Sequence, residues 1–172
     1  MPSITQLPEN FKVLIADLGI EFDEGDVQQL ANYLDLLLET NKQFNLTGIK
    51  EPEEAWTKHI LDSLSLIPTL VKEGVKHVVD VGSGGGLPGI PLAITLPDVT
   101  FTLVETTRKK ALFLSDAVEQ LGLDNVTVIA ERAENLSTKD GGFRGIADAV
   151  IARAVGPLNV LLELTIPFAK ID

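Results

Sequence analysis

A run of β-branched residues that leads directly into a glycine-rich turn constrains the fold of this chain most strongly. Residues 77–81 have the composition of a buried strand, glycine occupies positions 82, 84, 85 and 86, and an apolar helical pattern covers residues 87–96. Glycine supplies the left-handed backbone and the close ligand approach that such a turn requires. A strand, a glycine-rich turn and a helix in this order predict the first unit of a ligand-binding α/β domain.

The same alternation continues toward the C-terminus. We expect further strands at 99–104, 126–130 and 147–152, and helices at 106–121 and 157–168. The strands are almost continuously apolar, which is typical of a parallel sheet with both faces covered by helices. We therefore predict a Rossmann-like α/β domain over residues 75–172.

Residues 1–74 have a helical pattern without such alternation. Apolar residues at 11, 14, 15 and 18 form one helical stripe, and a second helix begins near Asp23 or Asp26. A polar loop follows, and Pro52 opens a third helix that we expect to end near Pro68. We predict that residues 1–74 form an N-terminal helical extension that packs on the α/β core.

Composition excludes several classes of site. The chain of 172 residues has no cysteine, which rules out disulfides, cysteine-ligated metals and thiol nucleophiles. Its two histidines, His59 and His77, are too far apart for a helical metal pair, so we expect no metal site. No apolar run approaches the roughly 20 residues that span a bilayer, and the first ten residues lack a signal-peptide pattern. A cytoplasmic protein without a membrane partner is predicted.

The charge balance bears on nucleic-acid binding. The chain has 14 Lys and Arg against 25 Asp and Glu, a net charge of −11, whereas proteins that coat nucleic acids generally have the opposite balance. A nucleic-acid partner must therefore meet a local basic patch, and the densest is Arg108, Lys109 and Lys110. Cations at the start of a helix oppose its dipole. That favours an RNA-binding role, although ordinary surface charge explains these residues equally well.

The spacing of residues around the turn narrows the class of ligand that the site can bind. Glycine recurs at every second position, at Gly82, Gly84 and Gly86. The dinucleotide pattern G-x-G-x-x-G would instead require glycine at Leu87. Asp80 would repel a pyrophosphate but suits a ligand with a cationic amino-acid end, such as S-adenosylmethionine. Glu105 closes the second strand, where an acid binds both ribose hydroxyls. These residues predict an S-adenosylmethionine site.

The ends of the last two strands add candidate residues. Ala133 and Glu134 follow the third strand, where the adenine is expected, and they equally suit a polar helix start. Arg153 follows the fourth strand and would lie over the ligand, where it can pair with a carboxylate, a phosphate or a guanine edge. The segment ARAVG after this strand lacks the D/N-P-P-Y/F tetrapeptide of enzymes that methylate amide or exocyclic amino nitrogens. That chemistry is disfavoured.

A polar cluster lies in the predicted third helix. His59, Asp62 and Ser63 share one face at helical spacing, opposite the apolar face. We predict a solvated surface here and keep His59, with Arg153, as a candidate on the substrate side.

These motifs resemble the bacterial RsmG (GidB) family of methyltransferases over about residues 41–170. The resemblance rests on NKQFNLT, KHILDSL, VVDVGSGGGLPGIPLAI, RKKALFL, AERAENL and IARAVGPL. It implies the class I methyltransferase fold with S-adenosylmethionine as cofactor. It also implies transfer to N7 of a guanine in 16S rRNA of the small ribosomal subunit, with no DNA partner.

The resemblance also assigns residues. The implied cofactor contacts are Gly82, Leu87, Ala133, Glu134 and Arg153, with Glu105 in place of the family's acid after the second strand. Guanine N7 carries no proton and attacks the sulfonium methyl with its own lone pair, so the reaction needs no general base. The absence of a catalytic triad or acid–base pair agrees with this, and no catalytic residue is identified.

Two other interpretations remain open. Class I methyltransferases build seven strands, so we expect truncation after the fourth strand and its helix, and self-association through the unpaired fourth strand. The chain would then be a non-catalytic remnant that binds the cofactor or a protein partner. A nicotinamide-dependent oxidoreductase is the weaker alternative. It would need a glycine at position 87, where this chain has leucine, and a catalytic tyrosine, but the one tyrosine, Tyr33, lies outside the α/β region.

Overall fold

A four-stranded parallel sheet organises the part of the chain that the structure, a computed structural model, describes, residues 7–171. The strand order is β3-β2-β1-β4. The strands are β1 (His77–Val81), β2 (Thr100–Val104), β3 (Val126–Ile129) and β4 (Ala149–Ile151). The parallel sheet predicted from the sequence is confirmed. Residues 1–6, most of the segment in which we found no signal-peptide pattern, lie outside the described residues.

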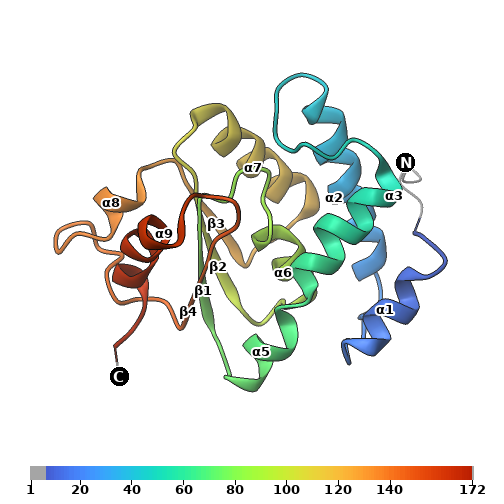
Figure 1. Ribbon diagram of the computed structural model, residues 1–172, viewed down its shortest axis with the longest axis horizontal. Helices are drawn as coiled ribbons and strands as arrows, with labels where there is room; N and C mark the ends of the chain where they lie inside the picture. The colour runs from blue at the N-terminus through green and yellow to red at the C-terminus, as the bar shows by residue number, and fades with distance from the viewer. Residues whose placement is uncertain (1–6, 172) are drawn as a thin grey trace.

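Helices cover both faces of the sheet (Figure 1). The first face carries α6 (Gly89–Thr95) and α7 (Arg108–Leu121), and α2 (Asp26–Asn41) packs against these two helices on the side away from the sheet. The second face carries α8 (Ala133–Leu136), α9 (Leu158–Thr165) and the 3₁₀ turn η2 (Ile166–Phe168). The fold is therefore a three-layer α/β/α arrangement of the Rossmann type.

Alternation along the strands divides the core in two. Val78, Phe101 and Leu103 pack in the cluster on the α6 and α7 side, whereas Val79, Val81 and Val104 pack in the cluster that contains Phe168. Successive side chains of a strand point to opposite faces. Asp80 shares the parity of Val78, so its carboxyl group enters the layer of α6.

The N-terminal helices complete the first of these clusters. They are α1 (Phe11–Asp17), α2, α3 (Pro52–Ala55), the π-helix η1 (Trp56–Leu61), α4 (Asp62–Leu64) and α5 (Ile67–Lys72). Trp56, Tyr33 and Leu34 are fully buried in the same cluster as Val78 and Phe101. The Tyr33 hydroxyl also donates a 2.7 Å hydrogen bond to the Gly85 carbonyl, which ties α2 to the glycine-rich turn. The helical region and the sheet share one hydrophobic core.

The single third helix expected from Pro52 to Pro68 is wrong in two respects. Residues 56–61 form a π-helical turn, and the helix breaks at Ser65 and Leu66 before α5 begins. Pro68 lies in the first turn of α5, where its missing N–H costs little. The helix expected from Leu87 begins at Gly89, after the glycine-rich turn has ended.

Within residues 7–171, no helix combines the length and the apolar character that a membrane crossing requires.

Tyr33→Phe tests the tie between α2 and the turn. Loss of the hydroxyl leaves the buried Gly85 carbonyl without this donor, which costs about 1–3 kcal/mol. Urea unfolding should show that loss. Ser115→Ala is the control, because the Ser115 hydroxyl bonds a carbonyl of its own helix, and it should change stability by less than about 0.5 kcal/mol. Equal unfolding midpoints for Tyr33→Phe and the unaltered protein would contradict the tie.

Candidate functional site

The glycine-rich turn lies at the carboxyl ends of the parallel strands. Gly82, Gly84 and Gly86 have left-handed φ values of +74°, +58° and +91°. The N–H groups of Gly82 and Ser83 both donate to the Val104 carbonyl, at 2.8 and 3.1 Å. A Cβ on Gly82 would lie 2.8 Å from Val155 Cγ2. Backbone conformation and space therefore both require glycine at this position.

Glu105 joins the end of β2 to the turn. Its side chain is buried, with 6% exposed. Oε2 accepts the Gly84 N–H at 2.8 Å, and Oε1 accepts the Thr107 N–H at 2.7 Å. Each carboxylate oxygen has a further lone pair. Glu105 thus shapes the turn and retains the capacity to accept ribose hydroxyl groups.

Asp80 is a buried carboxyl group with one unpartnered oxygen. It has no exposed surface. Oδ2 accepts the Gly89 N–H at 3.1 Å, whereas Oδ1 has no hydrogen-bond partner. Burial raises the pKa of Asp80 from 3.8 to about 7, and the negative charge of Glu105 adds to the rise, while the Gly89 hydrogen bond, the nearby Ser83 hydroxyl and the charge of Arg153 oppose it. An unpartnered buried oxygen is costly, and a positive charge near the turn would stabilise the ionised form of this carboxyl group.

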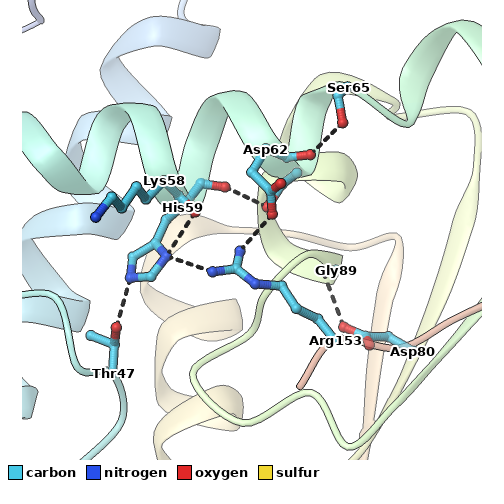
Figure 2. A network of polar contacts seen from close by, with 9 residues as sticks. Thr47, Lys58, His59, Asp62, Ser65, Asp80, Gly89 and Arg153 are labelled. Atoms are coloured by element: carbon cyan, nitrogen blue, oxygen red, sulfur yellow. Dashed lines mark hydrogen bonds and ion pairs between the residues drawn. The ribbon is translucent and has the colours of Figure 1, made fainter. Parts of the chain in front are cut away.

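Arg153 extends from the end of β4 to the N-terminal helices (Figure 2). Its Nη2 lies 3.0 Å from Nδ1 of His59, and its Nη1 lies 3.1 Å from Oδ2 of Asp62. On the other side of the imidazole, His59 Nε2 lies 2.7 Å from the Thr47 hydroxyl. We call Thr47, His59, Asp62 and Arg153 the arginine network. It joins residues 94 positions apart in the sequence.

The solvated polar face predicted for His59, Asp62 and Ser63 is wrong for two of the three. His59 is 3% exposed and Ser63 is fully buried, and the Ser63 hydroxyl donates to the His59 carbonyl at 2.6 Å. The reason is the π-helical turn η1, which changes the angular spacing that a regular α-helix would give. Single π-helical turns are frequent at functional sites.

The other predicted residues occupy the same edge of the sheet. Ala133 and Glu134 begin α8 directly after β3, with Ala133 buried and Glu134 exposed. Arg108 and Lys109 are exposed at the start of α7, and Lys110 is half-buried. Because parallel strands end at one edge, these segments lie at the edge that carries the glycine-rich turn. The sheet topology thus collects them at one edge.

Sequence reasoning missed Thr47 and Tyr33 as part of this site. Both are distant in sequence from the glycine-rich turn, and the periodicity around Tyr33 marks it only as a core residue of its helix. The only available signal was the polar segment NKQFNLT, which ends at Thr47. A surface hollow of about 1100 Å³ lies elsewhere, lined by residues such as Asn32, Lys42 and Gln120, and contains none of the predicted site residues. Among residues 7–171, no three acidic, histidine or cysteine side chains gather as metal ligands would.

Solved structures define the class to which this fold belongs. An O-methyltransferase from Bacillus cereus, in complex with SAH, superposes with a TM-score of 0.63 at 19% identity, covering 91% of this chain and 66% of that one. The O-methyltransferase TomG from Streptomyces achromogenes, in complex with SAM, has a TM-score of 0.60 at 16% identity, covering 95% and 71%. The chain therefore has the class I methyltransferase fold.

Sequence comparison narrows the class to a family. Residues 26–172 match the family GidB, rRNA small subunit methyltransferase G. Ribosomal RNA small subunit methyltransferase G of Sorangium cellulosum is 50% identical over 164 residues, which cover 95% of this chain and 68% of that protein. The protein of the same name from Limosilactobacillus reuteri is 42% identical over 167 residues, which cover 95% of this chain and 69% of that protein. This chain belongs to that family, and the resemblance seen in its motifs is confirmed.

Asp80→Asn tests the buried carboxyl group. A raised pKa means that the folded protein holds this proton more tightly than the unfolded chain does. The stability from Asp80 is therefore full below pH 3.8 and is lost as the pH rises toward about 7. At pH 8 the asparagine variant should be more stable by on the order of 2–4 kcal/mol, and at pH 4 nearly equal.

Chemical denaturation at both pH values measures this difference. Asp98→Asn is the matched control, because Asp98 is an exposed carboxylate far from the turn, and it should have the same effect at both values. An Asp80→Asn effect that does not change with pH would show that Asp80 is not a buried titrating group.

Proposed function

We propose that this chain is an S-adenosylmethionine-dependent methyltransferase acting on N7 of a guanine in 16S rRNA of the small ribosomal subunit. Such a reaction takes place in the cytoplasm, where ribosomal subunits are built. The observation that carries the proposal is the glycine-rich turn with the unpartnered Asp80 oxygen behind it, in a chain of the rRNA small subunit methyltransferase G family.

The residues at the sheet edge fit the cofactor. Gly82 leaves space that any Cβ would fill against Val155, and the carboxyl group of Asp80, buried behind the turn, suits the positive charge of an amino-acid end. Glu105, held by two backbone N–H groups, can accept ribose hydroxyls. The remaining contacts in this proposal are Gly84, Gly86 and Leu87 in the turn, Ala133 and Glu134 at the adenine, and Arg153 at the carboxylate.

The chemistry asks little of the protein beyond position. The cofactor supplies a methyl group on a positively charged sulfur. The N7 lone pair forms the new N–C bond, the C–S bond breaks, and its electron pair stays on sulfur. Since N7 carries no proton, no side chain has to remove one. The turn, Asp80 and Arg153 would serve by in-line positioning and by matching charge.

Gly82→Asp tests the cofactor site. The larger side chain meets Val155 and brings a negative charge into the turn, so calorimetric titration with S-adenosylmethionine should show affinity falling by at least about 100-fold. Gly142→Asp is the control, because Gly142 has a similar φ of +78° but nothing within 4 Å. The control should bind like the unaltered protein. If the unaltered protein binds no cofactor at millimolar concentration, the proposed function is wrong.

The basic start of α7 is the proposed RNA contact. Arg108→Ala with Lys109→Ala should raise KM for small subunits that lack the modification by about tenfold and leave kcat and cofactor affinity unchanged. The salt slope of binding should fall by about two. Lys72→Ala with Lys76→Ala removes the same charge at the opposite edge, before β1, and should change nothing. If the two double variants raised KM equally, binding of the small subunit would depend on net charge alone and not on the basic start of α7.

A further inference from the structure

Arg153 is held in place by a histidine from a distant part of the chain. From this geometry we propose that His59 is a positioning residue, which sets the Arg153 guanidinium for the carboxylate of the cofactor as long as the imidazole is neutral. The proposal rests on the proposed function, because it concerns the same site.

Two contacts of unequal strength hold the guanidinium. The Asp62 side chain is 60% exposed, and an ion pair with an exposed carboxylate contributes little. His59 is 3% exposed, and its ring cannot turn away without breaking the 2.7 Å contact with Thr47. The buried imidazole is therefore the contact that orients Arg153.

The hydrogen-bond partners determine the tautomer of His59. A guanidinium can only donate, so Nδ1 must be unprotonated to accept the Arg153 N–H at 3.0 Å. The proton is then on Nε2, which donates to the Thr47 hydroxyl oxygen. That oxygen also accepts the Ile49 N–H at 3.1 Å, and its second lone pair can receive the Nε2 proton. The Arg153 contact therefore selects the tautomer, and Thr47 is compatible with it as an acceptor.

The backbone beside Arg153 gives a second, independent observation. Ala154 has φ of +55°, and it is the one non-glycine residue with positive φ among residues 7–171. This conformation costs about 1–2 kcal/mol for an L-residue. Such strain persists only where the surroundings hold it, here with Arg153 on one side and Val155 over Gly82 on the other. The fold maintains a strained turn that directs Arg153 to His59.

Protonation of His59 breaks its hydrogen bond with Arg153. A protonated Nδ1 cannot accept a hydrogen bond from Arg153, but it can donate one to the Lys58 carbonyl oxygen, which lies 3.2 Å away. Burial lowers the pKa of His59 and the Arg153 charge lowers it further, while the Lys58 carbonyl and the carboxylates of Asp62 and Glu54 oppose the shift. The imidazole is therefore neutral at pH 7 and releases Arg153 only in acid.

Two isosteric variants separate the two ring nitrogens. In His59→Asn the amide oxygen takes the place of Nδ1 and still accepts from Arg153, without titrating. In His59→Gln the amide takes the place of Nε2, which keeps the Thr47 contact and removes the acceptor for Arg153. Calorimetric titration with S-adenosylhomocysteine, which has the same carboxylate, measures the affinity of each.

The expected result is asymmetric. At pH 7.5, His59→Gln should bind about tenfold more weakly, and His59→Asn within about threefold of the unaltered protein. As the pH falls below 6.5, the ordinary pKa of histidine, the unaltered protein should at some point lose affinity relative to His59→Asn, while the contribution of Asp80 cancels because both proteins share it. In an Arg153→Lys background, His59→Gln should have no further effect.

Equal losses in the two His59 variants, or no loss in His59→Gln, would overturn the proposal. If the unaltered protein does not bind S-adenosylhomocysteine at all, the proposed function is itself wrong. A second measurement needs no variant. ¹⁵N NMR of the imidazoles, of which the chain has two, should show His59 protonated on Nε2 at pH 7.5. A proton on Nδ1 would contradict the positioning role whatever the variants do.

Discussion

The turn from Gly82 to Gly86 is the constraint on which the rest of this structure depends. It reverses the chain between β1 and α6 in a space bounded by Val155, Leu37 and Ile90. Three groups form hydrogen bonds with the turn: the Val104 carbonyl and the Glu105 carboxylate at the end of β2, and the Tyr33 hydroxyl of α2. Each contact satisfies a backbone group that would otherwise be buried without a partner. The open conformation of the turn is therefore maintained by the surrounding fold.

The N-terminal helices act on this edge as well as closing the core. Tyr33 contacts the turn, and the π-helical turn η1 and the start of α4 place His59 and Asp62 against Arg153. The proposed cofactor site is thus assembled from the N-terminal helices and from the strand ends of the α/β domain. A site that depends on contacts 52 and 94 residues apart forms only when the whole fold is complete.

The charged groups near the glycine-rich turn include a buried carboxyl group that destabilises the folded protein when it ionises. Asp80 is buried with an unpartnered oxygen, and burial and the negative charge of Glu105 raise its pKa, while the positive charge of Arg153 opposes the rise. Such arrangements are characteristic of sites that await a charged ligand. The exposed Arg108 and Lys109 begin α7 at the same edge of a chain whose net charge is −11, and in the proposed function they are the local positive charge for an RNA backbone.

The sequence by itself determined the four strands, the glycine-rich turn between the first strand and its helix, and most of the helices. Strands such as 77–81, the glycine positions and the helix over Arg108–Leu121 follow from local periodicity and from backbone angles, which neighbouring residues decide. Only the tertiary structure decided that His59 is buried and meets Arg153, that Thr47 and Tyr33 belong to the site, and that Asp80 Oδ1 has no partner. These features depend on contacts between distant segments and on a π-helical turn, and neither can be predicted from the local pattern of residues.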